Sequence, residues 1–252
     1  MTDIAPGTTP DTTPDTSSAI RPDSTLAEIV TERPALAVHL ERLGLDYCCH
    51  GERTLADAVA AGGLALDDVV ATLERAGRGE TRADWADLGP VALVDHIEST
   101  HHAYLHEELP RLVALATKVA AVHGTRHPEL AAVHRLTIAV RDDLEPHLRK
   151  EEMVLFPAIR RLFAGEAQEG RMCGGSLATP ISVMLAEHDR AGELLAELRA
   201  ATDGYRTPAD ACGSYHALYE GLDTLEADTH LHVHKENHLL FPAVLAAESG
   251  TH

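Results

Sequence analysis

The chain contains two near-copies of one twelve-residue segment, and this duplication constrains the fold more than any other feature. The copies begin at His147 and His232, 85 residues apart, and both end in Leu-Phe-Pro-Ala. Each copy has a glutamate four residues after its histidine, Glu151 or Glu236, so each pair lies on one face if the segment is helical. A single pair of this kind is typical of a solvated helix surface. Two pairs in register indicate a repeated helical unit with a common site.

Two further histidines, His102 and His188, lie 86 residues apart and fall at nearly matching points of the repeat. Apolar residues at helical spacing place all six side chains on inward-facing stripes. The stripes are Leu105, Leu109, Leu112, Ala116 and Val119 after His102; Val133, Leu136, Val140 and Leu144 before His147, with Val154 and Ala158 after Glu151; Ile181, Met184, Ala191, Leu195 and Leu198 around His188; and Leu222, Leu225 and Thr229 before His232, with Leu239 and Ala243 after Glu236. His101 lies about 100° from its stripe, so His102 is the predicted ligand.

Four histidines and two glutamates on these stripes predict a dinuclear metal centre. The alternative is a set of core histidines with local hydrogen bonds, but a buried ionised carboxylate is costly unless it is paired or bound to a metal. Imidazole and carboxylate ligands suit iron, manganese or zinc, and helical bundles hold di-iron carboxylate sites in their cores. The two-fold pattern predicts two histidines on each metal, with Glu151 and Glu236 as bridges.

The composition favours a helical protein and excludes several functions. Of the 252 residues, 44% are hydrophobic but only 4% are aromatic, which suits helix packing better than a β-sandwich. The formal net charge of −19 disfavours binding to nucleic acid. The sequence has no run of eighteen apolar residues and no signal-peptide pattern, so we expect a cytoplasmic protein that does not enter a membrane. Four cysteines in a chain of this length do not resemble a disulfide framework.

The first third of the chain divides into a tail, a small domain and a linker. Residues 1–22 are rich in Thr, Pro and Asp, which predicts a disordered tail. Residues 23–77 predict a small helical domain, with helix N-caps at Ser24 or Thr25 and at Thr54. A polar linker is expected over residues 78–89.

The remainder, residues 90–248, predicts a four-helix bundle built from a duplicated helical hairpin, so the expected fold class is all-α. Each bundle helix is expected to begin at a proline, because proline is favoured at the first helical position. These prolines are Pro90, Pro128, Pro180 and Pro208.

Two adjacent cysteines, Cys48 and Cys49, are candidate catalytic residues of the small domain. Adjacent cysteines rarely bond to each other, because the ring strains the peptide. Beside His50 and near a helix start, one thiol could be a reactive thiolate or a soft metal ligand. Two structural thiols are an equal alternative. Cys173 and Cys212 are interpreted as incidental.

Five other histidines lie near the predicted ligands in the sequence. A solvated helix face is the preferred interpretation for them, and a position beside the ligands or an access channel is the alternative. They are His96, His106, His230, His234 and His238.

Five motifs connect this chain to a known family. They are Leu-Asp-Tyr-Cys-Cys-His-Gly at 45–51, Glu-Glu-Leu-Pro at 107–110, His-Leu-Arg-Lys-Glu-Glu at 147–152, Pro-Ile-Ser-Val-Met-x-x-Glu-His-Asp at 180–189 and His-Val-His-Lys-Glu-Asn at 232–237. Through them, residues 23–246 resemble the hemerythrin-like repair-of-iron-centres (RIC) family.

The resemblance implies a hemerythrin-like bundle with two non-haem iron ions, bridged by an oxo or hydroxo group, behind a domain that contains Cys-Cys. Its iron ligands fall on His102, His147, Glu151, His188, His232 and Glu236, the same six residues that the periodicity selects. It also implies repair of iron–sulfur clusters damaged by nitric oxide or peroxide, with iron released from the bundle for that purpose. Asp143 and Glu187 match positions proposed to line an access path.

Two features depart from related patterns. Pro146 directly precedes His147 and is expected to kink the second bundle helix beside a ligand. The second copy keeps His-x-x-x-Glu, whereas oxygen-carrying hemerythrins have five histidines and His-x-x-x-x-Asp. This difference argues against a simple oxygen carrier.

The favoured function is therefore a di-iron repair factor whose partners are damaged iron–sulfur proteins. One alternative is an enzyme that reduces nitric oxide or peroxide at the metal, with Cys48 and Cys49 as local reductant. Another is a module that binds oxygen or nitric oxide, although the chain has no recognisable output domain. A structural zinc bundle is the third. The sequence leaves the client proteins open, and it does not distinguish a monomer from a homodimer.

Overall fold

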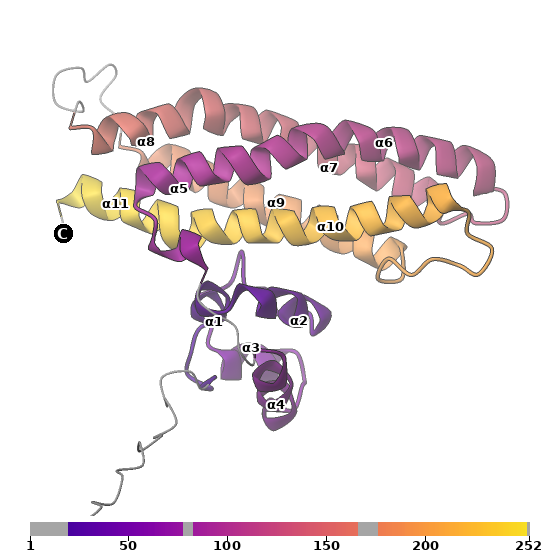
Figure 1. Cartoon of the computed structure of the whole chain (residues 1–252), viewed down its shortest axis with the longest axis horizontal. Helices are drawn as coiled ribbons and strands as arrows, with labels where there is room; N and C mark the ends of the chain where they lie inside the picture. The colour runs from indigo at the N-terminus through magenta and orange to yellow at the C-terminus, as the bar shows by residue number, and fades with distance from the viewer. Residues whose placement is uncertain (1–19, 78–82, 166–175, 251–252) are drawn as a thin grey trace, which may run out of the picture.

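The computed structural model describes residues 20–77, 83–165 and 176–250, which form a long helical bundle and a small amino-terminal module (Figure 1). The bundle has four rods, and consecutive rods run in opposite directions. The first rod joins α5 (Pro90–Ile97) to α6 (Ala103–His123), the second joins α7 (Leu130–Lys150) to α8 (Phe156–Phe163), the third is α9 (Ala178–Ala201), and the fourth joins α10 (Gly213–Lys235) to α11 (Phe241–Ser249). The predicted all-α four-helix bundle is confirmed.

The core of the bundle consists of the predicted apolar stripes wherever they run through regular helix. Every stripe residue of α6, α7, α9 and α10 is buried, and most belong to one apolar cluster. Helix α9 shows the pattern clearly, since Ile181, Met184, Ala191, Leu195 and Leu198 are all at most 3% exposed. Burial of these side chains supplies the main driving force for packing the rods together.

Three of the rods contain a five-residue π-helical turn where their two helices meet. These turns are Glu98–His102, Glu151–Leu155 and Glu236–Leu240. In the last two, the backbone N–H of Phe156 or Phe241 donates to the carbonyl oxygen of the glutamate five residues earlier. A proline follows each phenylalanine and has no N–H to donate, so an ordinary α-helical bond cannot form at that point. The repeated Phe-Pro therefore explains why the wide turn occurs in both copies.

The extra residue in each π-helical turn shifts the buried face by one position. The expected stripe through Val154 and Ala158 is wrong: Val154 is 61% exposed, whereas Leu155 and Ile159 are buried. The fourth rod shows the same shift, with Leu240 and Val244 buried in place of the expected Leu239 and Ala243. Residues before the turn, including His147, keep the predicted register.

The helix starts agree with the proline pattern only once among the described residues. Pro90 is the first residue of α5, but α7 begins two residues after Pro128, and α9 begins two residues before Pro180. Pro208 lies in a loop, and α10 begins later, at Gly213. The loop contains three consecutive residues with positive φ, Asp203, Gly204 and Tyr205, which end the preceding helical path. Helix α7 continues through Pro146 to Lys150, so that proline does not end the helix.

The amino-terminal module consists of short helices held by local caps. Its elements are α1 (Leu26–Glu32), a 3₁₀ turn (Pro34–Leu36), α2 (Ala37–Arg42), α3 (Leu55–Ala61) and α4 (Leu66–Ala76). Thr25 caps α1 in a reciprocal arrangement with Glu28, and the Thr54 hydroxyl accepts from the backbone N–H of Asp57. Ile20 is buried in the core of this module, although the sequence pattern places it in the tail.

The module packs against the side of the bundle that α10 presents. Val233 of α10 belongs to the same apolar cluster as Leu40 and Tyr47 of the module. The 3₁₀ turn Asp84–Asp87 brings the ring of Trp85 to 6.0 Å from that of His234, measured between centroids. One face of α10 therefore lies under the module rather than in solvent.

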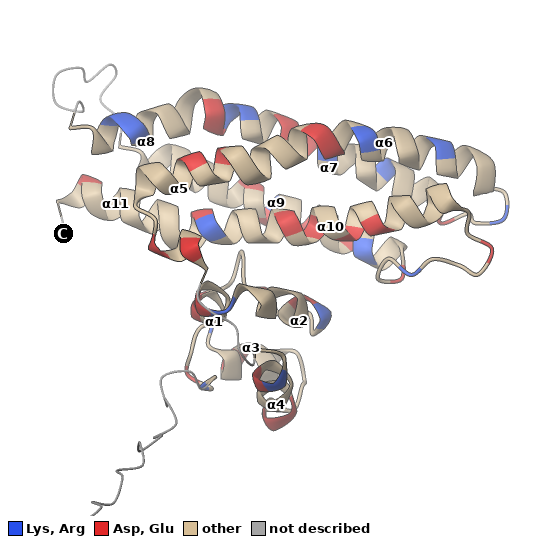
Figure 2. Cartoon of the chain, in the orientation of Figure 1, with Lys and Arg blue, Asp and Glu red and all other residues tan. Residues whose placement is uncertain are grey.

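Charged residues of both signs lie along the described helices. Figure 2 shows basic and acidic residues interspersed along the bundle helices, without a continuous basic band over the described residues in this view. Among those residues, no helix is long and apolar enough to span a membrane.

Candidate metal centre

Six side chains from all four rods meet in the bundle core, as the duplicated motif predicts. Each is at most 3% exposed: His102, His147, Glu151, His188, His232 and Glu236. One group of ligand atoms comes from His102, His232 and the two glutamates, and a second comes from His147, His188 and the same glutamates. Two groups of potential ligand atoms therefore lie side by side and share the two carboxylates.

Each glutamate lies between histidines of the two groups. Glu236 places Oε1 3.2 Å from His232 Nε2 and Oε2 3.1 Å from His188 Nε2. Glu151 Oε2 is 3.4 Å from Nε2 of both His102 and His147. A carboxylate that faces two histidine pairs in this way is placed to bridge two cations.

The cluster contains buried polar atoms that the protein itself does not satisfy. Both carboxylate oxygens of Glu151 and of Glu236, and Nε2 of His102 and His232, have no hydrogen-bond partner among the described residues. An unsatisfied buried polar group costs about 1–3 kcal/mol, and more if it is charged. Cations that accept these lone pairs remove the cost, so the residues fit a metal centre.

One contact within the cluster also indicates a cation. His147 Nε2 and His188 Nε2 are 3.1 Å apart, while the Nδ1 atom of each ring faces an oxygen. Because the Nδ1–H of each ring is directed at its oxygen partner, the two Nε2 atoms need a proton or a cation between them. Two nitrogens bound at right angles to one ion at about 2.1 Å would lie about 3.0 Å apart.

The electrostatics of the site are dominated by burial and by the two glutamates. Burial favours the neutral form of His188, but the close approach and negative charge of Glu236 outweigh burial and raise the pKa of His188 to about 9. Burial lowers the pKa of His232. Burial favours the neutral form of Glu236, but His232 and His188 hold its pKa well below its usual range. His188 and Glu236 therefore form an ionic pair. A divalent cation would compete with protons for their ligand atoms.

Outer partners orient three of the four rings. His102 Nδ1 faces Glu152 Oε1 at 3.0 Å, His147 Nδ1 faces Glu187 Oε2 at 3.0 Å, and His188 Nδ1 faces Asn237 Oδ1 at 2.8 Å. Such partners fix the tautomer of a metal-binding histidine and the orientation of its ring. In the fourth case His232 Nδ1 is buried without a partner, and its ring stacks on that of His101 at 5.5 Å.

Sequence reasoning missed these outer partners as a group, although their positions carry a signal. Glu152 and Asn237 directly follow the two glutamates, and Glu187 directly precedes His188. Each is a polar residue beside a buried ligand in the repeat, which is where an orienting hydrogen bond can originate.

His101 lies beside the centre but does not belong to either group of ligand atoms. Its Nδ1 faces Asp228 Oδ1 at 2.9 Å, and Lys235 Nζ donates to its Nε2 at 2.7 Å. Lys235 is itself buried. Burial lowers its pKa and the charge of Asp228 raises it, and the net result is a pKa of about 8. The sequence prediction preferred His102 to His101, and the geometry agrees with that preference.

The solvated-face interpretation is wrong for His234, which is fully buried. Its Nε2 lies 3.1 Å from the hydroxyl of Thr31, so it contacts the module. His230 and His238 of the same rod also face the module, through Glu41 and the carbonyl oxygen of Cys48. The sequence pattern of α10 shows one apolar stripe and gives no sign that a second face is covered.

The two cysteines lie outside the bundle core, in the loop between α2 and α3, and they contact the metal centre indirectly. Cys48 is buried and Cys49 is half-buried, and both are free thiols. Asn237 Nδ2 donates to the carbonyl oxygen of Cys48 at 3.0 Å, while its Oδ1 faces His188. A hydrogen bond to Cys49 and burial raise the pKa of the Cys48 thiol well above its usual range. This shift favours the protonated thiol of Cys48 over the thiolate.

The remaining candidates lie apart from the centre. Cys212 is exposed, and its sulfur lies 3.2 Å from His123 Nε2 at the other end of the bundle core. Cys173 lies outside the described residues. His106 is half-exposed, and its Nε2 lies 2.7 Å from Glu152 Oε1.

Gly51 allows the cysteine loop to approach the bundle. A Cβ atom at this position would lie 2.2 Å from the carbonyl oxygen of Tyr47 and 2.6 Å from His238 Nε2. We expect Gly51→Ala to lower the free energy of unfolding by about 1–3 kcal/mol, because the loop and module must shift. Thermal denaturation followed by circular dichroism measures this. Gly213→Ala is the control, since its Cβ would meet open space. Equal stabilities for the two variants would contradict the packing role of Gly51.

Comparison with known proteins agrees with the fold and with a cation-binding bundle. A family model described as the hemerythrin HHE cation binding domain matches residues 93–244, and a domain of unknown function (DUF542) matches residues 22–77. The iron-sulfur cluster repair protein YtfE of Enterobacter sp. (strain 638) is 34% identical over 226 residues, which cover 90% of this chain and 98% of that protein. The YtfE protein of Escherichia coli O81 (strain ED1a) is 33% identical over the same shares.

A helical bundle with a paired histidine and glutamate core is a cation-binding bundle of the hemerythrin type. The chain belongs to the hemerythrin-like repair-of-iron-centres family, as its motifs predicted.

Proposed function

We propose that the protein holds two iron ions in the bundle and supplies iron for the repair of iron–sulfur clusters damaged by nitrosative or oxidative stress. The observation that carries this proposal is the six-residue cluster with shared carboxylates, in a chain whose relatives are named as iron–sulfur cluster repair proteins. The ligands of the pair would be His102 and His232 on one ion, His147 and His188 on the other, and Glu151 and Glu236 as bridges. Bound iron would supply a labile pool of metal.

The surface around one histidine pair suits the exit of an ion. Glu187 is about one-quarter exposed, pairs with Lys150 and accepts a hydrogen bond from His147 Nδ1. Asp143 lies on α7 one helical turn before His147, and its carboxylate is paired with Arg190 at 2.9 Å. These carboxylates, each paired with a Lys or Arg side chain, would line a path between α7 and α9.

Reactivation of a damaged cluster tests the function directly. Aconitase inactivated by nitric oxide would be incubated anaerobically with the iron-loaded protein, and recovery of its activity would be followed. We expect faster recovery than with the same amount of ferrous iron in buffer. The metal-free protein is the control. Recovery no faster than with free iron would reject the iron-supply function.

A second candidate function is nitric oxide reduction, which the nearness of the thiol pair to His188 favours. Oxidation of one of these thiols to a mixed disulfide with an external low-molecular-weight thiol would release two electrons and two protons, the number needed to convert two nitric oxide molecules into nitrous oxide and water. Stopped-flow measurement of nitric oxide consumption distinguishes the candidates. Catalytic turnover would support the reductase, and a single stoichiometric reaction would support the repair factor.

The metal content is the simplest quantity to predict. After anaerobic reconstitution we expect about two irons per chain, because the ligand atoms form two groups with shared bridges. The oxidised protein should show near-ultraviolet charge-transfer bands of an oxo-bridged pair. Metal analysis, absorption and Mössbauer spectroscopy measure these properties. A content of one iron or none would contradict the dinuclear assignment.

A further inference from the structure

A second cluster of metal-binding side chains lies outside the bundle, on the loop between α2 and α3. Asp46, Cys48 and Cys49 each offer one ligand atom, and these atoms lie within 4.8 Å of one another. The two sulfur atoms are 3.7 Å apart, and Cys48 Sγ lies 3.3 Å from Asp46 Oδ1. The backbone N–H groups of both cysteines donate to the same carboxylate oxygen, which fixes the loop around it.

These separations are close to the edges of a tetrahedral coordination shell. Two thiolates bound to one ion at about 2.3 Å would lie about 3.8 Å apart. A thiolate and a carboxylate oxygen, the latter bound at about 2.1 Å, would lie about 3.6 Å apart. The folded loop therefore holds the two sulfur atoms, and Cys48 Sγ with the Asp46 oxygen, near the spacings that a thiophilic divalent cation requires.

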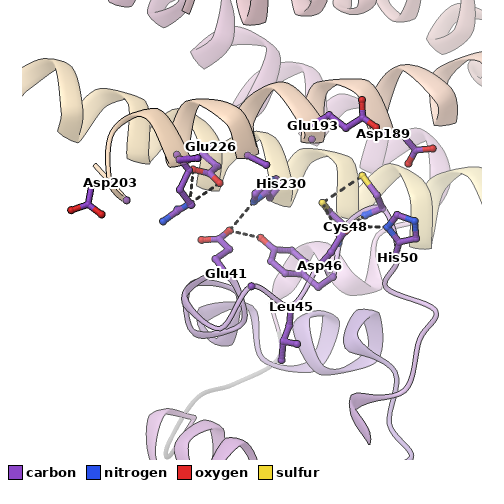
Figure 3. Close-up of a pocket in the computed structure, with 18 residues that line it drawn as sticks. Glu41, Leu45, Asp46, Cys48, His50, Asp189, Glu193, Asp203, Glu226 and His230 are labelled. Atoms are coloured by element: carbon purple, nitrogen blue, oxygen red, sulfur yellow. Dashed lines mark hydrogen bonds and ion pairs between the residues drawn. The ribbon is translucent and has the colours of Figure 1, made fainter. Parts of the chain in front are cut away.

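The surroundings of the cluster also favour a cation. It borders a cavity of about 760 Å³ between the module and the bundle (Figure 3). The lining residues include six carboxylates, Glu41, Asp46, Asp189, Glu193, Asp203 and Glu226, but a single arginine, Arg199. Opposite Cys49 the bundle presents Gly192, so no side chain at that position covers the sulfur atom. Negative charge around a cavity raises the local concentration of cations.

We propose that Asp46, Cys48 and Cys49 form a third metal site, which takes a divalent thiophilic cation. The site follows from the geometry of the loop; its occupant, ferrous iron that has left the bundle, rests on the function proposed above. Asn237 links the two sites, since it contacts both His188 and the carbonyl oxygen of Cys48. The ion would move by ligand exchange without a change in oxidation state, and two thiol protons would pass to solvent as the sulfurs bind.

Zinc is a suitable probe, because its absorption edge distinguishes it from the iron of the bundle. One equivalent of zinc would be added to the reduced, iron-loaded full chain, and zinc-edge X-ray absorption would be recorded. We expect one bound zinc with two sulfur neighbours at about 2.3 Å. Asp46→Asn should weaken zinc binding by roughly tenfold or more and keep both sulfurs, because one ligand is lost. Cys48→Ser with Cys49→Ser should remove the sulfur signal.

Two control variants match these changes. Cys212→Ser removes a thiol far from the loop, and Asp203→Asn removes a carboxylate that lines the same cavity away from the sulfurs (Figure 3). Both should bind zinc as the parent protein does. Iron content and circular dichroism should be the same in all variants, which shows that each has folded.

Zinc bound only by nitrogen and oxygen in the parent protein would overturn the third site. A sulfur signal that survives the double cysteine change would also overturn it. These results are separate from the repair assay. If zinc binds through sulfur but aconitase does not recover, the site stands and the iron-supply function is rejected. If aconitase recovers and zinc does not bind through sulfur, the third site alone is rejected.

Discussion

Replacement of Glu236 by alanine is expected to remove most of the iron from the bundle and to lower its free energy of unfolding. The side chain is fully buried, and its two oxygens face His232 and His188, one from each histidine pair. Its loss therefore takes a ligand from both ions at once. It also leaves imidazoles without their charge partner, and breaking a buried ion pair typically costs about 3–5 kcal/mol. Metal analysis after gel filtration and chemical denaturation measure the two effects.

The same result is expected for Glu151→Ala, since Glu151 Oε2 faces both His102 and His147. The controls are His106→Ala, a half-exposed residue outside the ligand groups, and His234→Ala, a buried residue that contacts the module. His106→Ala should retain its iron. His234→Ala should lose stability at the module contact but keep its iron. Equal iron content in all four variants would contradict the ligand assignment.

The double change Cys48→Ser and Cys49→Ser is expected to abolish the advantage of the protein over free iron in cluster repair. Iron in the bundle would be held by nitrogen and oxygen ligands, whereas a damaged cluster presents sulfur. A pair of thiols beside the bundle, which would lose their protons on binding metal, provides an intermediate of matching chemistry. Aconitase should therefore recover at the rate seen with ferrous iron in buffer. The two bundle irons and their optical spectrum should remain, because neither cysteine is within the ligand groups.

Two further variants, Cys212→Ser and the single change Cys49→Ser, serve as comparisons in this experiment. Cys212→Ser should repair as the parent protein does, since Cys212 contacts His123 and not the module. Cys49→Ser alone changes the more accessible of the two thiols and should already slow repair. If the double variant repairs as well as the parent protein, the cysteines are structural.

The positions of the six clustered side chains were predictable because the sequence contains the same pattern twice, so each copy supports the interpretation of the other. Any one histidine on an apolar stripe has several explanations, but His102 with His188, and His147 with His232, occur at matching points of a repeat. Helical periodicity then places them in the core, and the structure brings them together. Helical periodicity predicts these positions correctly because, in both copies of the repeated segment, the α-helix is regular as far as the histidine, His147 or His232.

Two features could not be predicted from helical periodicity: the buried face after each π-helical turn, and the second buried face of α10. A π-helical turn adds a residue to the helical repeat, so Leu155 rather than Val154 faces the core. The covered face of α10 depends on contacts with a module more than 180 residues earlier in the chain, as between His234 and Tyr47. No pattern within α10 records that contact. The burial of His234 therefore became apparent only in the folded chain.

The division of ligands between the two helical hairpins has a mechanical consequence. The first hairpin provides His102 and His147, and the second provides His188 and His232, yet each group of ligand atoms takes one histidine from each hairpin. Each ion would then be a cross-link between two halves that the duplication made. Loss of iron would remove these cross-links between the two hairpins. The metal-free protein should therefore exchange backbone amide hydrogens faster around the ligands. A client or protease could recognise that looser form and so distinguish a spent donor from a loaded one.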